Sequence, residues 1–286
     1  MGVVDAGGQV DGVRRFYDRN TSFFRRFGEG RTSIHRAVWG PGVSERSEAF
    51  HYVEEQLLAL VADVERPQVV DLGCGVGGSL LHLAGRRVDL VGDGLTISGA
   101  QVEAAAGLVA EAGLTGRVRV RQGDFLAPPD DLAGADLVFS IEAFVHGPDP
   151  AAYVRAATGL MRPGALLALC DDLLTPAGAS ASGESRQRLD DFRSGWRVGS
   201  LVTVDEVVRL AAEAGLTLVE DADLTPWLEL GRPRDRAIRV LVGATRPLRP
   251  GSEYWRSLSG GDALQRCLVA GLVDYRLLVF RREPDV

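Results

Sequence analysis

The sequence is poor in the residues that build covalent or metal-based scaffolds. It has three cysteines among 286 residues, an odd number of widely separated thiols that fits neither a disulfide framework nor a zinc-binding spacing. No apolar run approaches the roughly 18–20 residues of a membrane span. The N-terminus also lacks the basic and apolar regions of a signal peptide. We therefore expect a cytoplasmic protein with reduced thiols, no resident metal and no membrane partner.

Lysine is absent as well, so arginine carries all of the basic side-chain charge, 32 residues in total. The formal net charge is −7, which disfavours a general nucleic-acid partner. Basic residues are nevertheless concentrated in residues 14–36, which hold seven arginines and His35 against Asp18 and Glu29. A guanidinium fork suits phosphate oxygens, so this segment is a candidate site for an anionic small molecule. The alternative interpretation is a solvated helix face.

From residue 69 onward, short apolar runs alternate with helical patterns. This alternation is typical of a doubly wound, mostly parallel sheet with helices on both faces, and we expect an α/β fold with seven strands. The predicted strands are 69–72, 88–92, 117–121, 135–140, 165–170, 216–220 and 275–281. The predicted helices are 79–85, 98–113, 150–161 and 203–214, with a further amphipathic helix at 45–64.

The remaining segments suggest how the chain is divided. We expect a flexible N-terminus at 1–12, a helical lid at 13–64 and the α/β domain at 65–286. Within that domain, two segments near 174–200 and 223–272 break the strand–helix repeat. Insertions this late in an open sheet lie above the carboxyl ends of the strands, where such sheets bind ligands. They are predicted to cap the site, and the later one is a candidate homodimer interface.

A glycine-rich turn follows the first predicted strand. Residues 69–79 read Val-Val-Asp-Leu-Gly-Cys-Gly-Val-Gly-Gly-Ser. Such a turn lets a ligand lie against the backbone and leads into a helix N-terminus with free N–H groups. No Lys-Ser/Thr of a phosphate-binding loop follows it. The pattern therefore indicates a nucleotide cradle with an acid, Asp71, just before it.

This Asp-Leu-Gly-Cys-Gly-x-Gly-Gly pattern resembles the first motif of class I methyltransferases that use S-adenosylmethionine (SAM) and release S-adenosylhomocysteine. The resemblance implies that Asp71, Gly73 and Gly75 bind the cofactor. Further along, Thr-Ile-Ser-x-x-Gln resembles the ribose-binding segment of cyclopropane synthase-like, tocopherol-type and prenyl diphosphate C-methyltransferases. It implies ribose contacts for Thr96 and Gln101.

The ribose assignment leaves two alternatives open. Asp93 is a rival acid for the ribose, and Thr96 and Ser98 could instead serve as helix caps. Gln-Gly-Asp-Phe, residues 122–125, resembles the adenine-binding motif of the same family. It implies that Asp124 and Phe125 hold the adenine.

The resemblance extends upstream to the lid. Phe16-Tyr17-Asp18 and Ile34-His35-Arg36-Ala37-Val38-Trp39 are similar to the N-terminal lid of tocopherol and sugar methyltransferases, although Ala37-Val38 replaces the usual Gly-Tyr. It implies that Tyr17 takes part in catalysis and that Trp39 lines the acceptor site. We assign Arg25 of the arginine-rich segment to the acceptor as well.

Candidate catalytic groups follow the fourth predicted strand, in Phe139-Ser140-Ile141-Glu142-Ala143-Phe144-Val145-His146. In related C-methyltransferases a Glu at the position of Glu142 is the base or cation stabiliser, and in sugar O-methyltransferases a His at the position of His146 is the base. We assign Ser140 to the cofactor and Phe144 to the acceptor. The alternatives are a supporting hydrogen-bonding role for Glu142 and a solvated loop position for His146.

Two further acids and one aromatic residue complete the predicted site. Asp171 and Asp172 end the fifth predicted strand, where one of them could orient His146 or cap the next turn. Trp196 joins the predicted acceptor walls because an aromatic face stabilises a cation.

The sequence therefore predicts a SAM-dependent small-molecule methyltransferase of specialised metabolism. Carbon methylation of a prenyl diphosphate is favoured, with Mg²⁺ only if the acceptor is a diphosphate. An indole-like aromatic, or O- or N-methylation by His146, is the alternative. Lipid cyclopropanation and a non-catalytic SAM-binding module are the more distant competing hypotheses.

Overall fold

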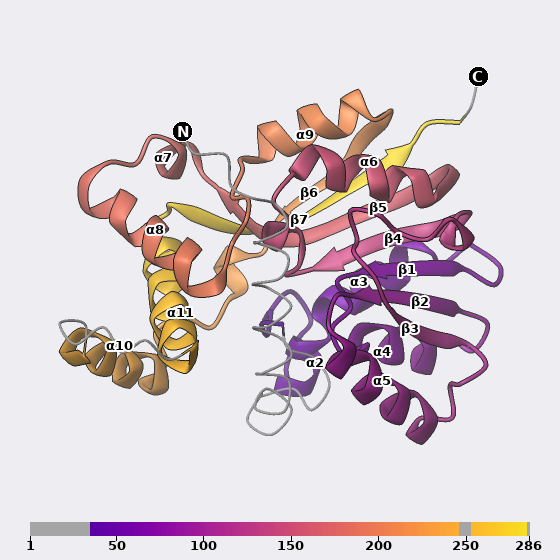
Figure 1. Ribbon diagram of the computed structural model, residues 1–286, viewed down its shortest axis with the longest axis horizontal. Helices are drawn as coiled ribbons and strands as arrows, with labels where there is room; N and C mark the ends of the chain where they lie inside the picture. The colour runs from indigo at the N-terminus through magenta and orange to yellow at the C-terminus, as the bar shows by residue number, and fades with distance from the viewer. Residues whose placement is uncertain (1–34, 246–252, 285–286) are drawn as a thin grey trace.

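The computed structural model describes residues 35–245 and 253–284. Within them, seven strands form one sheet in the order β3-β2-β1-β4-β5-β7-β6 (Figure 1). The strands are β1 (Gln68–Leu72), β2 (Val91–Thr96), β3 (Val118–Gln122), β4 (Ala135–Ile141), β5 (Met161–Leu174), β6 (Leu216–Asp223) and β7 (Val273–Arg282).

Strands β1 to β5 pair in parallel, whereas β7 is antiparallel to both β5 and β6. This topology confirms the predicted seven-stranded, mostly parallel, doubly wound sheet of the class I type. All seven strands overlap their predicted ranges, but the range 88–92 was wrong at its start. Val88 is 82% exposed, and pairing begins only at Val91, opposite Gln68.

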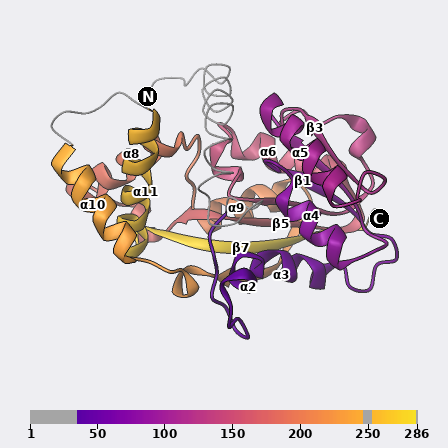
Figure 2. The same ribbon diagram turned by 90° about the horizontal axis from the view of Figure 1, so that it is seen from below.

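Both faces of the sheet are covered by helices, because its strands carry apolar side chains on both sides. Along β1, Val69 belongs to one buried cluster and Val70 to the other. Helices α3 (Tyr52–Leu60), α4 (Gly78–Arg86) and α5 (Gly99–Glu111) cover the first face (Figure 2). Helices α6 (Pro150–Leu160) and α9 (Val204–Glu213) cover the second.

The predicted helix at 45–64 is interrupted. It is divided into α2 (Arg46–Phe50) and α3 at His51, whose backbone leaves the helical region. Residues 1–34, and with them Tyr17, Arg25 and the first part of the predicted lid, lie outside the described residues.

Four further helices gather beyond the carboxyl ends of the parallel strands, at the left of Figure 1. They are α7 (Pro176–Ala179), α8 (Gly183–Trp196), α10 (Pro233–Thr245) and α11 (Glu253–Val269). We call α8, α10 and α11 the cap. Helix α8 packs so closely on α11 that a Cβ atom on Gly195 would lie 2.4 Å from the Cα atom of Gly260.

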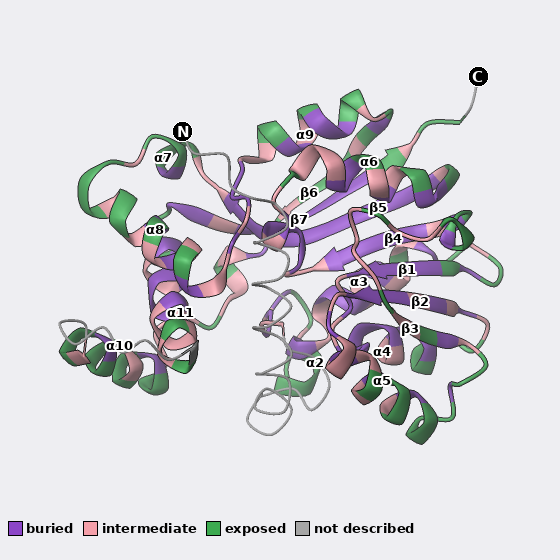
Figure 3. Cartoon of the chain, in the orientation of Figure 1, coloured by how far each residue is buried: buried purple, intermediate pink, exposed green. Residues whose placement is uncertain are grey.

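Burial follows this division of the molecule. The strands and the inner sides of the helices are buried, while α10 is largely exposed (Figure 3). Among the described residues, no helix has the length and apolar character needed to cross a membrane.

Candidate functional site

The glycine turn after β1 forms one wall of a cavity at the carboxyl end of the sheet. Gly73 has a φ of +96°, and Gly75 a φ of +56°, so both take the left-handed conformation that favours glycine. The N–H groups of Gly73 and Cys74 both donate to the carbonyl of Leu95, which anchors the turn to β2. A Cβ atom on Gly75 would meet no atom closer than Gln101 Nε2, at 3.8 Å. The turn is thus shaped to leave room for a ligand.

Three of the four predicted ribose and adenine residues lie on this same cavity. Thr96, Gln101 and Phe125 line it together with Asp71 and the glycine turn. The Thr96 hydroxyl donates to Gln101 Oε1 at 2.6 Å, which leaves the amide nitrogen of Gln101 on the side of Gly75. Ser98 caps α5 by accepting the Gln101 N–H, so capping and ligand contact are divided between neighbouring side chains.

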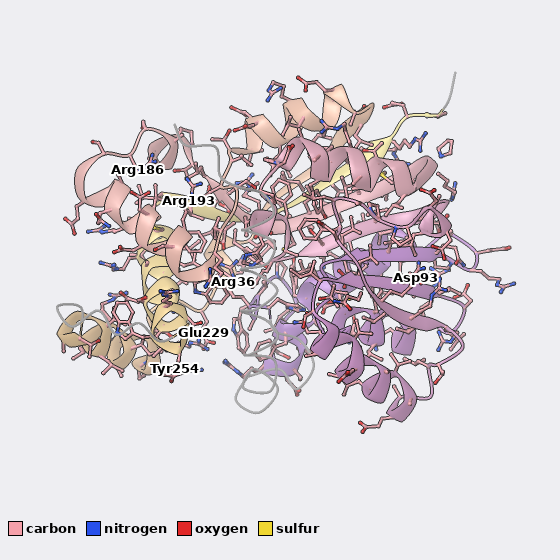
Figure 4. The ribbon with its side chains drawn as sticks, in the orientation of Figure 1. Arg36, Asp93, Arg186, Arg193, Glu229 and Tyr254 are labelled. Atoms are coloured by element: carbon pink, nitrogen blue, oxygen red, sulfur yellow. The ribbon has the colours of Figure 1, made fainter. Side chains whose placement is uncertain are left out.

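Two other acids considered for the cofactor lie elsewhere. Asp124 is next to the cavity in sequence, but its carboxylate accepts the N–H of Leu126 and it is not a lining residue. Asp93 pairs with Arg119 at 2.7 Å, and in Figure 4 it lies within the strands, well to the right of Arg36. Because this pairing engages Asp93, Thr96 and Gln101 remain the better ribose candidates.

A second, larger cavity of about 340 Å³ lies between the sheet and the cap. Its walls are mainly apolar, with side chains from α8, α10 and α11 and from the loop before α10. The apolar lining residues include Phe192, Leu228, Leu230, Ile238, Leu258, Leu264 and Leu268 from these elements, with Phe50, Val145 and Val198 from other segments. The two cavities share four lining residues: His35, Glu142, His146 and Trp196. A group carried in the first cavity can therefore meet a molecule held in the second at this junction.

Glu142 is the most constrained residue of the junction. It follows directly after β4 and has a φ of +52°, a left-handed conformation that is rare and costly for a side chain of this kind. Its Oε1 accepts three hydrogen bonds: from Arg36 N at 2.9 Å, from Arg36 Nε at 3.0 Å and from the hydroxyl of Tyr275 at 3.1 Å. The surrounding contacts thus hold the carboxylate in place despite its strained backbone.

Arg36 connects this carboxylate to a second acid. Its Nη1 donates to Asp172 at 2.9 Å, and its guanidinium lies 3.9 Å from the centre of the Tyr275 ring. Figure 4 shows Arg36 between the sheet and the cap. Asp171 instead accepts the N–H of Val145. The predicted roles for these acids were to orient His146 or to cap the next turn. Asp172 instead pairs with Arg36.

The charges at the junction follow from these contacts. Burial alone would raise the pKa of Glu142, but Arg36 and His35 outweigh it and hold that pKa below its usual value. Burial lowers the pKa of His146, so its imidazole is neutral near pH 7. His146 Nδ1 lies 3.5 Å from the carbonyl oxygen of Arg197. The site therefore offers a stable carboxylate and a neutral imidazole side by side.

The predicted acceptor residues are only partly brought together. Trp196 lines both cavities. Phe144 and Ser140 are buried in the core beside the site and line neither cavity. Trp39 lines neither cavity, although it packs with Ala37 and Phe50, which line the larger one.

Sequence reasoning did not assign three residues that matter here. Tyr275 comes from the last strand, Glu54 from α3, and Arg36 was counted only as one of several basic residues. The roles of Tyr275 and Arg36 depend on contacts with Glu142, which is more than 100 positions away from each. The role of Glu54 depends on its burial. The motif Ile-His-Arg at 34–36 was the one sequence signal that pointed to this region.

Comparison with known proteins agrees with this geometry. A family model described as a methyltransferase domain matches residues 46–221, more than half of the chain. The protein therefore belongs to this methyltransferase family. With its sheet topology and glycine turn, it is a class I, SAM-dependent methyltransferase.

Individual relatives differ in the atom that they methylate. The chain is 26% identical to a probable chloroplastic tocopherol O-methyltransferase of Oryza sativa subsp. japonica, over 96% of this chain and 79% of the relative. It is 30% identical to 24-methylenesterol C-methyltransferase 2 of the same organism, over 77% of this chain and 62% of the relative. Among solved structures, geranyl diphosphate C-methyltransferase from Streptomyces coelicolor A3(2) has the same fold, with a TM-score of 0.68, 17% identity, and coverage of 96% and 97% of the two chains.

The residues of the first cavity fit SAM. The left-handed Gly75 leaves space above the turn, Thr96 and Gln101 present hydroxyl and amide groups, and Phe125 offers an aromatic face. We call it the cofactor cavity, and the larger one the acceptor cavity. Bound SAM would supply an electrophilic sulfonium methyl group at the junction.

Proposed function

We propose that the protein transfers the methyl group of SAM to an electron-rich carbon of a small, largely apolar acceptor. The observation that carries this proposal is the position of Glu142, a partly buried carboxylate held ionised where the two cavities meet. Methyl transfer to an alkene or aromatic carbon breaks the C–S bond, forms a C–C bond and leaves a positive charge on the acceptor. A fixed anion stabilises that charge and then accepts the proton released.

The neighbouring residues have matching roles. Trp196 lines both cavities and presents an aromatic face to the developing cation. Tyr275 and Arg36 fix the orientation of Glu142 through Oε1, which leaves Oε2 as the oxygen available to a proton. The apolar cavity holds the acceptor and excludes water, and much of the rate would come from this positioning.

A prenyl diphosphate is our first candidate for the acceptor. Its hydrocarbon part suits the apolar walls, and its charged end requires cations. Arg36 is engaged by Glu142 and Asp172, so the diphosphate would depend on other arginines: Arg232 and Arg234 of the cavity wall and those between positions 14 and 31. Within residues 35–245 and 253–284, no group of three or more His, Cys, Asp or Glu is arranged to hold a metal. Any Mg²⁺ would thus enter with the diphosphate.

The neutral state of His146 favours a second candidate function. A neutral imidazole at the junction can take a proton from a hydroxyl or amine during methyl transfer. O- or N-methylation of a small natural product would then depend on His146 and only weakly on Glu142. An indole carbon is the intermediate case, because it would use Glu142 without needing the arginine-rich segment.

The deciding experiment uses purified protein, methyl-labelled SAM and a panel of short prenyl diphosphates, indoles and phenols. We expect label on carbon of a diphosphate, loss of turnover in Glu142→Gln, and a raised acceptor KM in Arg25→Ala. His146→Gln should keep most of the activity. Label on oxygen or nitrogen, lost in His146→Gln and retained in Glu142→Gln, would contradict the proposal and select the second function.

A further inference from the structure

His35 occupies a position that the cofactor motifs do not explain. Its side chain is only 8% exposed and lines both the cofactor and the acceptor cavity. Its Nε2 lies 2.7 Å from Oε1 of Glu54 on α3, a carboxylate with no exposed surface. Glu54 also accepts a hydrogen bond from the hydroxyl of Ser79, which lines the cofactor cavity at the start of α4.

This pairing makes His35 a cation. Burial alone would lower the pKa of His35, but the charge of Glu54 and its hydrogen bond raise it to about 9. At neutral pH the imidazole therefore carries protons on both nitrogens. One of them bonds Glu54, whereas Nδ1 is buried and has no hydrogen-bond partner of good geometry within the described chain. A buried donor of this kind is costly unless a ligand or water accepts its proton.

The cofactor cavity also contains an acidic side chain. Asp71 is 4% exposed and lines the cavity beside the glycine turn. Burial and the nearby charge of Glu54 outweigh the opposing charge of His35 and raise the pKa of Asp71 to about 8, so this carboxyl is largely neutral until a cation approaches it. The amino-acid end of SAM carries one ammonium and one carboxylate. The imidazolium of His35 suits the carboxylate, and Asp71 ionises when an ammonium lies beside it, so the cavity is complementary to such a zwitterion.

We propose that His35 is a further cofactor-binding residue, which donates its Nδ1–H to the carboxylate of the methionine part of SAM. Glu54 is a positioning residue, because it touches no ligand and keeps the imidazole charged and oriented. The location of His35 supports this assignment. It lines the side of the cofactor cavity shared with Glu142, whereas Thr96 and Phe125 line only the cofactor cavity. The methionine chain extends from the sulfonium, which must lie at that shared side.

The inference rests on SAM as cofactor and is independent of the acceptor. It is tested by binding, with S-adenosylhomocysteine and its decarboxylated analogue measured by calorimetry against wild type, His35→Gln and the double variant His35→Gln/Glu54→Gln. A charge-assisted hydrogen bond contributes about 1.5–3 kcal/mol, so we expect S-adenosylhomocysteine to bind the variants about 10- to 100-fold more weakly. The decarboxylated analogue should bind all three proteins with equal affinity.

His82→Gln is the matched control. His82 also places its Nε2 2.8 Å from a carboxylate of α3, that of Glu55, but lines neither cavity. The His82→Gln variant should bind S-adenosylhomocysteine with the affinity of the wild-type protein. The double variant removes both buried charges together, so it remains informative if His35→Gln alone folds poorly.

A spectroscopic readout on the unaltered protein completes the test. The chain has four histidines, so the imidazole ¹⁵N resonances can be assigned with single variants. Addition of S-adenosylhomocysteine should shift the Nδ1 resonance of His35, and the decarboxylated analogue should not. Equal loss of affinity for both ligands, or a His35 resonance that moves only with an anionic acceptor, would overturn the proposal.

Discussion

The cofactor cavity and the acceptor cavity share four residues but are built in different ways. The cofactor cavity depends on backbone geometry in one short stretch, where Gly73 and Gly75 turn the chain from β1 into α4. The acceptor cavity depends on side chains from the cap, from the end of β5 and from the segment that follows β4. A local motif thus defines the first, whereas only the completed tertiary structure defines the second. The two should respond differently to substitution.

Loss of the junction carboxylate should have the largest effect and should separate chemistry from binding. In Glu142→Gln the acceptor loses its base and fixed anion, so we expect methyl transfer to slow by about 10²- to 10⁴-fold. The affinity for S-adenosylhomocysteine should change less than about threefold, since the cofactor cavity keeps its shape. Single-turnover transfer and calorimetry measure the two effects. A large loss of cofactor affinity with little change in rate would show that Glu142 serves binding instead.

The buried pair of His35 and Glu54 should make stability depend on pH. The pKa of His35 is raised to about 9 in the folded state, against about 6.5 when unfolded. The stabilisation is therefore fully present below about pH 6.5 and is lost as the pH rises through about 9, by up to about 3 kcal/mol. The pKa of Asp71 is also raised in the folded state, to about 8, so its contribution to stability likewise falls as the pH rises towards 8.

Urea unfolding at pH 6.5 and pH 9.5 measures this loss. The double variant His35→Gln/Glu54→Gln should lose less stability between the two values than wild type. A wild-type midpoint that is the same at both pH values would show that His35 is not charged in the folded protein.

A methyl group on the glycine turn should affect the cofactor cavity alone. Gly75→Ala places a Cβ in the space over the turn and strains a residue with a φ of +56°, so we expect cofactor affinity to fall about tenfold. The backbone cost is about 1–2 kcal/mol. Gly113→Ala is the control, with a φ of +68° and no atom within 4 Å of its Cβ. The midpoint temperature of thermal unfolding should fall by a similar amount in both variants. Calorimetry should find weaker cofactor binding only in Gly75→Ala.

The smallest effect is expected in the cap. Asp262 lines the acceptor cavity and pairs with Arg239 at 3.1 Å and with Arg266 at 3.2 Å. Because both arginines are partly exposed, Asp262→Asn should cost only about 1 kcal/mol and raise the acceptor KM a few-fold. Cofactor affinity should stay unchanged. Arg209→Ala breaks an exposed ion pair on α9 and should change neither the acceptor KM nor the cofactor affinity. If Asp262→Asn weakened cofactor binding, the two cavities would be coupled through the cap.

The same contrast explains what the sequence could reveal. The order of strands and helices was readable because apolar periodicity is local, and the glycine turn was readable because its conformation permits few other residues. Thr96 and Gln101 are five positions apart and meet in one turn. Strand β2 was misplaced because Val88 is apolar in sequence yet exposed in the loop before the strand.

The environment of Glu142 could not be derived in this way. The strand end predicted that its side chain would face the ligand edge of the sheet. It did not predict that Arg36 and Tyr275 would bind the same oxygen, because those contacts depend on how the segment before α2 and strand β7 pack. Phe144 illustrates the opposite error, since its position beside Glu142 suggested a cavity wall but its ring is buried against Tyr153.

Strand β7 has a consequence for how the enzyme is made. It follows every other described strand in the chain, yet it is inserted between β5 and β6 and supplies the tyrosine that holds Glu142. During synthesis the glycine turn after β1 can form long before β7 emerges from the ribosome, but β6 has no neighbouring strand and Glu142 lacks one of its supports until then. The nascent chain could thus hold its cofactor before it can use it, and its reactive centre would be completed last.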